Sequence, residues 1–180
     1  MYTTLHTGEI IFYYAQPDIF DDVKHQSAFM CKNILSKEGE DLSERFLITD
    51  DEEPMIGICI RESLPNIFEA VRPLTHGISD AFKPDMTGAQ IKAISGLENL
   101  DVDTTTKYVV IRTQDNGAYN PNEPGLADSA ILSAVESGAL SEYYSRVVNR
   151  DLTELSAGRF GNDLNGVMRR IIPLRKKSQL

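Results

Sequence analysis

The chain has 180 residues, and its 41% hydrophobic and 25% charged content is ordinary for a globular protein with a core of its own. The formal net charge is −9, which divides into −14 on residues 1–168 and +5 on the last 12 residues. The five basic residues of that end are Arg169, Arg170, Arg175, Lys176 and Lys177. An acidic body repels nucleic acid phosphates, whereas the basic end can contact DNA or an acidic neighbour, or remain a solvated tail.

No apolar run approaches the roughly 20 residues of a membrane span, and the first residues lack the features of a signal peptide. We therefore expect neither membrane insertion nor secretion. Cys31 and Cys59 have apolar neighbours, which predicts two buried thiols in a reducing compartment, although a disulfide between them stays open. The histidines His6, His25 and His76 are scattered without the spacing of a metal site.

Residues 1–16 carry the compact apolar run Ile10-Ile11-Phe12-Tyr13-Tyr14, which is rich in β-branched and aromatic side chains and stops before Pro17. This composition predicts a short strand or an extended N-terminal arm, with a helix as the alternative. A first helix follows, capped by Asp18 or Asp21 and running to about Glu38.

Residues 49–74 form the most periodic segment of the chain. Thr49 and Glu52 have the spacing of a capping box, which predicts the helix start. Steps of three and four residues place six apolar side chains on one helical stripe, namely Ile56, Ile60, Leu64, Ile67, Val71 and Leu74. We expect Pro65 to kink or split this helix and Pro73 to close it.

Residues 75–124 contain several glycines and prolines, which indicates an insertion that differs from the long helices on either side of it. Lys107–Thr113 reads as a strand because of its β-branched and aromatic residues. A second strand is expected in residues 75–83 or 90–94, so that the insertion forms a β-hairpin or small sheet.

Residues 126–149 predict a third helix whose small residues Ala130, Ala134, Gly138 and Ala139 allow close approach of another helix. Asp151 can cap a fourth helix, and Pro173 is expected to end it. The glycines of the fourth helix (Gly158, Gly161 and Gly166) each weaken it by about 1 kcal/mol relative to alanine.

The predicted fold is mainly α, an antiparallel bundle of about four helices with a small β-hairpin insertion and extended terminal arms. Short connections imply that the first helix pairs with the second and the third with the fourth. The expected organisation is an N-terminal arm or strand at 1–16, a bundle domain at 17–172 with its insertion at about 75–124, and a basic tail at 173–180.

No pattern of residues indicates catalysis. The acids Asp50 to Glu53 are explained by the dipole at a helix start, and consecutive helical residues do not converge on one ion. Asp101 and Asp103 lack the glycine and glutamate that a calcium loop needs downstream. Tyr143 and Tyr144 have the chemistry to stack on bases, but one core and one interface tyrosine is the simpler interpretation. We expect no catalytic, cofactor-binding or metal site, and no enzyme.

The order of elements resembles that of small head–tail connector proteins, the neck adaptor or ring subunits of tailed bacteriophages. The resemblance covers about residues 41–171. It rests on the acid-led helix DDEEPMIGICIRESLPNIFEAVRPL, on the strand KYVVIRT with its loop DNGAYNPNEPG, and on the helix ADSAILSAVESGALSEYYSRV, which ends in an aromatic pair where such proteins often carry Trp-Tyr.

The resemblance implies a virion structural protein, assembled in the host cytoplasm, whose copies form a ring between portal and tail. Its partners would be further copies, the portal, the tail or a second connector ring, with DNA passing nearby. The candidate assembly contacts are aromatic, apolar and basic side chains, namely Ile11, Phe12, Tyr13, Tyr14, Tyr143, Tyr144, Arg169, Arg170, Arg175, Lys176 and Lys177.

Two other classes of function stay open. One is a cytosolic helical regulator or protein-binding module that uses the small-residue face between Ala130 and Ala139. The other is a hydrolase or metal enzyme whose site is assembled from residues distant in sequence.

Overall fold

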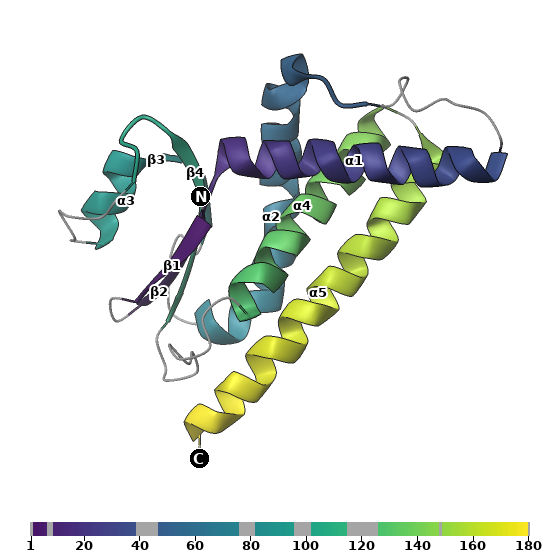
Figure 1. Ribbon diagram of the computed structural model, residues 1–180. Helices are drawn as coiled ribbons and strands as arrows, with labels where there is room; N and C mark the ends of the chain where they lie inside the picture. Colours follow the sequence, from purple (N-terminus) through teal and green to yellow (C-terminus); the bar gives the residue numbers. More distant parts are fainter. Residues whose placement is uncertain are drawn as a thin grey trace.

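The computed structural model describes residues 2–6, 9–38, 47–75, 82–95, 102–114, 126–147 and 149–179. The fold is mainly helical with a small antiparallel sheet, as the sequence predicts (Figure 1). The strands are β1 (Tyr2–His6), β2 (Glu9–Ala15), β3 (Phe82–Thr87) and β4 (Lys107–Gln114). The helices are α1 (Gln16–Glu38), the short 3-10 helix η2 (Asp50–Glu52), α2 (Glu53–Thr75), α3 (Gly88–Ser95), α4 (Leu126–Arg146) and α5 (Arg150–Gln179).

The sheet has the order β1-β2-β4-β3, so the N-terminal segment supplies one of its two central strands. β2 pairs antiparallel with β1 and with β4, and Phe12 lies opposite Ile111. Of the three possibilities for residues 1–16, the strand holds for residues 2–6 and 9–15, whereas the extended arm and the helix do not. The physical reason is the apolar run itself, which is stabilised by burial between two neighbouring strands.

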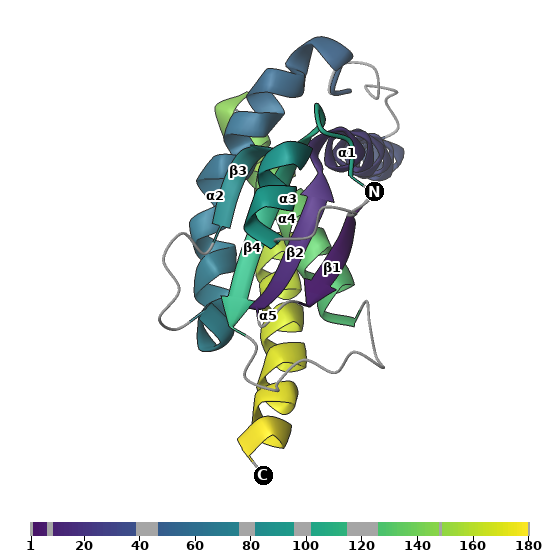
Figure 2. The ribbon, with the colours of Figure 1, turned by 90° about the vertical axis from the view of Figure 1, so that its left-hand side faces the viewer.

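The sheet is covered on both faces. Figure 1 shows it almost edge-on, with α3 on one side and the long helices on the other, and Figure 2 shows the strands with α3 in front of them. Ile10, Phe12 and Tyr14 of β2 point into the large core beneath the long helices. Ile11 and Tyr13 point into a smaller core under α3. Burial on both faces explains why the strand reads as a continuous apolar run rather than an alternating one.

Helix α2 contributes a continuous row of buried apolar side chains to the large core. The five residues of its predicted stripe whose side chains are described are buried, namely Ile56, Ile60, Leu64, Ile67 and Val71. The side chain of Leu74 lies outside the described residues. At the helix start, the Glu52 carboxylate accepts hydrogen bonds from the backbone nitrogen of Thr49 at 3.0 Å and from its hydroxyl at 3.2 Å. The helix start predicted from the Thr49–Glu52 spacing is confirmed.

Helix α4 packs against α2 and most extensively against α5. Gly138 lies where the three helices meet, because a β-carbon there would come within 2.9 Å of Ser63 and 3.0 Å of Phe160. The predicted close approach along the small residues of α4 is therefore confirmed.

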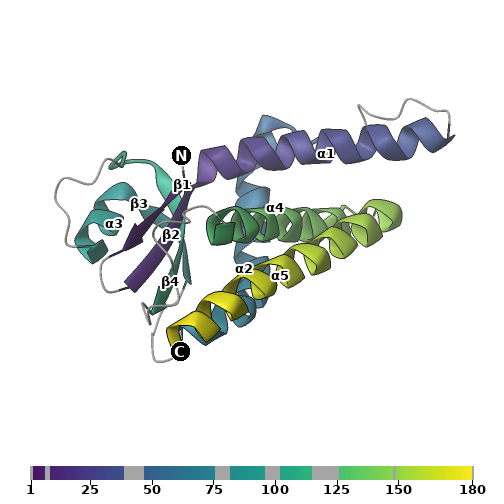
Figure 3. The same ribbon diagram turned by 60° about the horizontal axis from the view of Figure 1, so that its bottom comes forward.

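Helix α1 does not pair with α2, so that prediction is wrong. It runs across α2, as Figures 1 and 3 show, and it contacts α4 more than α2. The link between α1 and α2 includes residues outside the described part of the chain. Packing of its apolar residues on α4 and the sheet, rather than connection length, sets the direction of α1.

The prolines interrupt and end the helices less than predicted. α2 continues through Pro65 and Pro73 to Thr75, and α5 continues through Pro173 to Gln179. A proline removes one helical hydrogen bond and crowds one carbonyl group, but water can satisfy that carbonyl on an exposed face. Pro65 is on such a face. The basic tail expected at 173–180 is therefore a helical extension as far as Gln179.

The insertion also differs from its prediction. Its second strand is β3, and residues 90–94 are helical because they lie in α3. β3 and β4 are antiparallel neighbours, but α3 lies between them in sequence, so they are not joined by a tight hairpin turn. At the start of α5 the cap is Asn149, whose side-chain oxygen accepts from the Leu152 backbone nitrogen at 3.0 Å, and not Asp151 as predicted. Asn149 and Asp151 are both residue types that cap helix starts, and they are two positions apart, so the sequence alone does not show which of them caps α5.

Candidate functional site

The aromatic and apolar assembly contacts predicted on β2 are not on the surface. Ile11, Phe12, Tyr13 and Tyr14 are at most 4% exposed within a single chain. They serve the two cores on either side of the sheet, so the prediction that they contact other subunits is wrong. The sequence shows an apolar run but not what covers it.

Tyr143 and Tyr144 are both buried, which removes them from any role in base stacking or subunit contact. Their rings meet edge to face with centroids 5.4 Å apart. The Tyr144 hydroxyl shares a hydrogen bond with the buried Ser27 hydroxyl and lies 3.9 Å from the Cys31 sulfur. The Tyr143 hydroxyl donates to the Glu52 carboxylate. The pair therefore ties α4 to α1 and to the start of α2.

The two cysteines are buried thiols that are not joined by a disulfide, as predicted. Burial raises the pKa of the Cys59 thiol to about 11, and burial also raises the pKa of Cys31. A thiol with a raised pKa is a poor nucleophile near neutral pH, because the thiolate is the reactive form. Both residues act as small core side chains.

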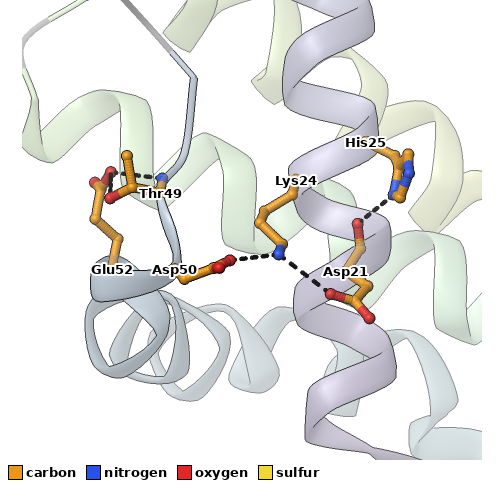
Figure 4. Close-up of polar contacts among 6 residues, drawn as sticks. All are labelled: Asp21, Lys24, His25, Thr49, Asp50 and Glu52. Atoms are coloured by element: carbon orange, nitrogen blue, oxygen red, sulfur yellow. Dashed lines mark hydrogen bonds and ion pairs between the residues drawn. The ribbon is translucent and has the colours of Figure 1, made fainter.

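Lys24 joins α1 to the start of α2 at an exposed cluster of polar side chains (Figure 4). Its ammonium group lies 2.7 Å from Asp50 and 3.3 Å from Asp21, and it covers the Phe20 ring at 4.7 Å from the centroid. The hydrogen bond from Lys24 to Asp50 raises the pKa of Lys24. In the same cluster His25 donates from Nδ1 to the Asp21 carbonyl at 2.7 Å. The cluster consists of local and interhelical ion pairs, which at exposed positions contribute little stability.

A second exposed pair joins α4 to α2. The Arg146 guanidinium contacts the Glu62 carboxylate, and this hydrogen bond lowers the pKa of Glu62. Burial, followed by the interaction with the nearby Glu62 carboxylate, which carries the same charge, raises the pKa of the neighbouring Glu142. The arrangement is an ion pair with a third, competing charge and has no reactive group.

Strand β3 and helix α3 line an open groove of about 410 Å³, formed by residues 83–86 and by Gln90, Ala93 and Ile94. Asp85 lies at its edge with a φ of 60°, in the β-bulge between Lys83 and Met86. Its carboxylate accepts from Gln16 at 2.8 Å and also from Arg61, and these bonds hold the pKa of Asp85 below its ordinary value. Asp85 was not predicted from the sequence, although Pro84 beside it in a strand is a signal for an irregular edge.

The start of α3 was also not predicted from the sequence. The backbone nitrogen of Thr87 donates to the Gln90 side chain at 2.9 Å, and the Gln90 nitrogen donates to the Thr87 hydroxyl at 3.3 Å. Thr-x-x-Gln is the sequence signature of a capping box, so the residues themselves carry a signal for a helix start. This signal favours the helix over a strand at residues 90–94.

The basic assembly contacts belong to α5. Arg169 is exposed, whereas the side chains of Arg170, Arg175, Lys176 and Lys177 lie outside the described residues. The helix that carries all five extends past the sheet and the other helices (Figures 1 and 2). A rigid helix places this charge farther from the body than a collapsed tail would.

The acidic segments are explained by local bonds. Asp103 accepts from the backbone nitrogen and the hydroxyl of Thr105, both at 2.9 Å, which closes the turn before β4 and lowers the pKa of Asp103. Asp101, and the side chains of His6 and His76, lie outside the described residues. Across the described segments, no group of three or more His, Cys, Asp or Glu side chains has the arrangement of a metal site.

Within the described residues, no helix is both long enough and apolar enough to cross a lipid bilayer. No family model matches this chain, and neither a curated protein nor a solved structure is significantly similar to it.

Proposed function

We propose that this chain is a structural, non-enzymatic subunit of a bacteriophage head–tail connector, which assembles as a ring between portal and tail around the DNA path. The observation that carries the proposal is the separation of charge between the C-terminal end of α5 and the rest of the chain. Its projecting end bears the five basic residues, and the rest of the chain carries −14. In such a subunit α1, α2, α4 and α5 form the helical bundle, and β3 and β4 form its insertion.

Charge separation of this kind favours contact between copies. The basic end of α5 in one copy is attracted to the acidic body of the next, and a head-to-tail contact repeated with closure gives a ring. An acidic wall also suits a DNA path, because it repels phosphates and lets the duplex slide. Portal and tail proteins are the further partners of this proposal, and the virion is its location.

The experiment measures assembly of the purified chain by native mass spectrometry and electron microscopy at low and high salt. We expect a discrete ring that loses subunits as salt rises, because salt screens contacts between exposed charges. The variant Arg175→Gln, Lys176→Gln, Lys177→Gln should keep its helical content and lose the ring. The control variant Lys92→Gln, Arg150→Gln, Arg159→Gln changes the net charge equally and should still assemble. A monomer at every salt concentration, with or without portal and tail proteins, would contradict the proposal.

The alternative of a cytosolic protein-binding module lacks the surface first assigned to it. Ala134, Gly138 and Ala139 are buried between helices of the same chain, and Ala130 packs against the same core. A stable monomer that binds a single small partner would favour this class over the connector.

A further inference from the structure

The Glu136 side chain is buried in the core side of α4, only 5% exposed. One carboxyl oxygen, Oε2, accepts a hydrogen bond from the Gln26 amide of α1. The other, Oε1, is buried and has no hydrogen-bond partner among the described residues. A buried ionised carboxylate with one oxygen unpaired is costly, and a carboxyl group in that position avoids the cost by staying protonated.

The charges that act on Glu136 from the neighbouring helices oppose its ionisation. They are the carboxylates of Asp22 on α1 and Asp163 on α5. Burial, followed by these two acids, raises the pKa of Glu136 to about 9. Acids from three helices, α1, α4 and α5, therefore act on one another here, and Glu136 is the buried one.

Among the long helices, α1 makes the fewest contacts with the other long helices in the described part of the chain. It makes far fewer contacts with α4 than α5 or α2 does, and only a few with α2. Its polar attachments include the Gln26–Glu136 and Ser27–Tyr144 bonds to α4 and the exposed Lys24–Asp50 ion pair to η2. If Glu136 loses its proton, water must reach the carboxylate, and the simplest route is separation of α1 from α4.

We propose that Glu136 is a pH-sensitive contact that holds α1 on α4 and α5 while it is protonated and releases α1 when it ionises. The proton goes to solvent. The inference is independent of the connector proposal, because it concerns contacts within one chain. It gives the subunit a way to loosen one helix without unfolding the α2–α4–α5 core.

The direction of the pH dependence follows from the two states. In the released or unfolded state the Glu136 carboxyl loses its proton near the ordinary value of 4.5, and in the closed state near 9. Between these values the closed state holds a proton that the released state lacks, so raising the pH favours release. One proton changes the opening equilibrium by at most about tenfold per pH unit.

The test is amide hydrogen exchange of the wild-type chain and Glu136→Gln, compared at the same pH in steps from about 6 to 9. Intrinsic exchange rates of the shared sequence cancel in this comparison. We expect the α1 amides to exchange progressively faster in the wild type than in the variant as pH rises, by up to about tenfold per unit. Amides of α2 around Leu64 and Ile67 should exchange alike in both proteins.

Two further variants keep the test decisive if Glu136→Gln folds poorly. Asp163→Asn removes one opposing charge and should weaken the pH dependence of α1 exchange, whereas Glu69→Gln, which removes an exposed acid of α2, should leave it unchanged. A wild-type to variant ratio that is constant with pH would overturn the proposal. An equal change in α1 and α2 would do so as well, because it indicates global unfolding rather than release of one helix.

Discussion

Gly88 lies against the backbone of Asp103, so that a β-carbon at Gly88 would come within 1.9 Å of the Asp103 carbonyl oxygen. The backbone nitrogen of Gly88 also donates to the Thr106 carbonyl at 3.2 Å. These contacts fix the start of α3 against the turn that leads into β4. Only a residue without a side chain fits there.

We therefore predict that Gly88→Ala destabilises the protein by about 1–3 kcal/mol, because the backbone of the turn must move. Denaturant unfolding followed by circular dichroism measures the change. Gly57→Ala is the matched control, since a β-carbon at Gly57 meets no atom within 4 Å. Equal stability of the Gly88→Ala variant and the wild type would contradict the close approach.

Alanine at two glycines of α5 should have the opposite effect. A β-carbon at Gly158 or Gly161 meets no atom within 4 Å. Each replacement should stabilise the protein by about 0.5–1 kcal/mol, because it lowers the backbone entropy lost on helix formation. The midpoint of thermal unfolding measures the gain. A loss of stability would indicate that this face of α5 contacts another molecule under the conditions used.

Ile60→Asp should unfold the chain or destabilise it by about 4 kcal/mol or more, because it places a charge in the centre of the α2 stripe. Ile60 is 2% exposed, whereas Ile58 on the same helix is 44% exposed. Ile58→Asp is thus the control, with an expected change of about 1 kcal/mol or less. Urea unfolding of both variants decides the prediction, and similar losses in the two would remove Ile60 from the core.

Tyr144→Phe should cost about 1–3 kcal/mol, because it leaves the buried Ser27 hydroxyl without this partner. Adding Ser27→Ala removes the second hydroxyl as well. A double-mutant cycle on the free energy of unfolding should give a coupling of about 0.5–3 kcal/mol between the two positions. Strictly additive losses would mean that the hydroxyl contact between α1 and α4 does not contribute.

Asp85 should make stability fall at acid pH. Its pKa is held below the ordinary 3.8 by the bonds from Gln16 and Arg61, so its contribution is complete above that value and is lost as the pH falls through the folded-state pKa. Asp85→Asn should flatten the stability curve at pH values below 3.8. Asparagine tolerates the positive φ, which isolates the charge from the backbone.

The local elements of this protein could be predicted where a short-range pattern defines them. The steps of three and four residues from Ile56 to Val71 define a helical face, and the composition of Lys107–Thr113 defines a strand. The Thr49–Glu52 spacing defines a helix start. Each pattern depends on residues within a turn or two of one another, so the sequence alone contains the information.

The contacts around Glu136 were not predicted from the sequence, for a physical reason. Glu136 shares a helical face with Leu132, Ala139 and Leu140, which marks a buried acid, but only the packing of α1 and α5 places Asp22, Gln26 and Asp163 around it.

A run of apolar and aromatic residues shows that its side chains must be buried, but it does not show which segment or subunit buries them. The run from Ile10 to Tyr14 is compatible with contact to another subunit until β4 and α3 are in place. The helix start at Thr49–Glu52 and the apolar stripe from Ile56 to Val71 were determined by the sequence. The pairing of β2 with β4, the crossing of α1 and the buried contacts of Tyr143 and Tyr144 were decided by tertiary structure, because they depend on the free energy of contacts between segments far apart in the chain.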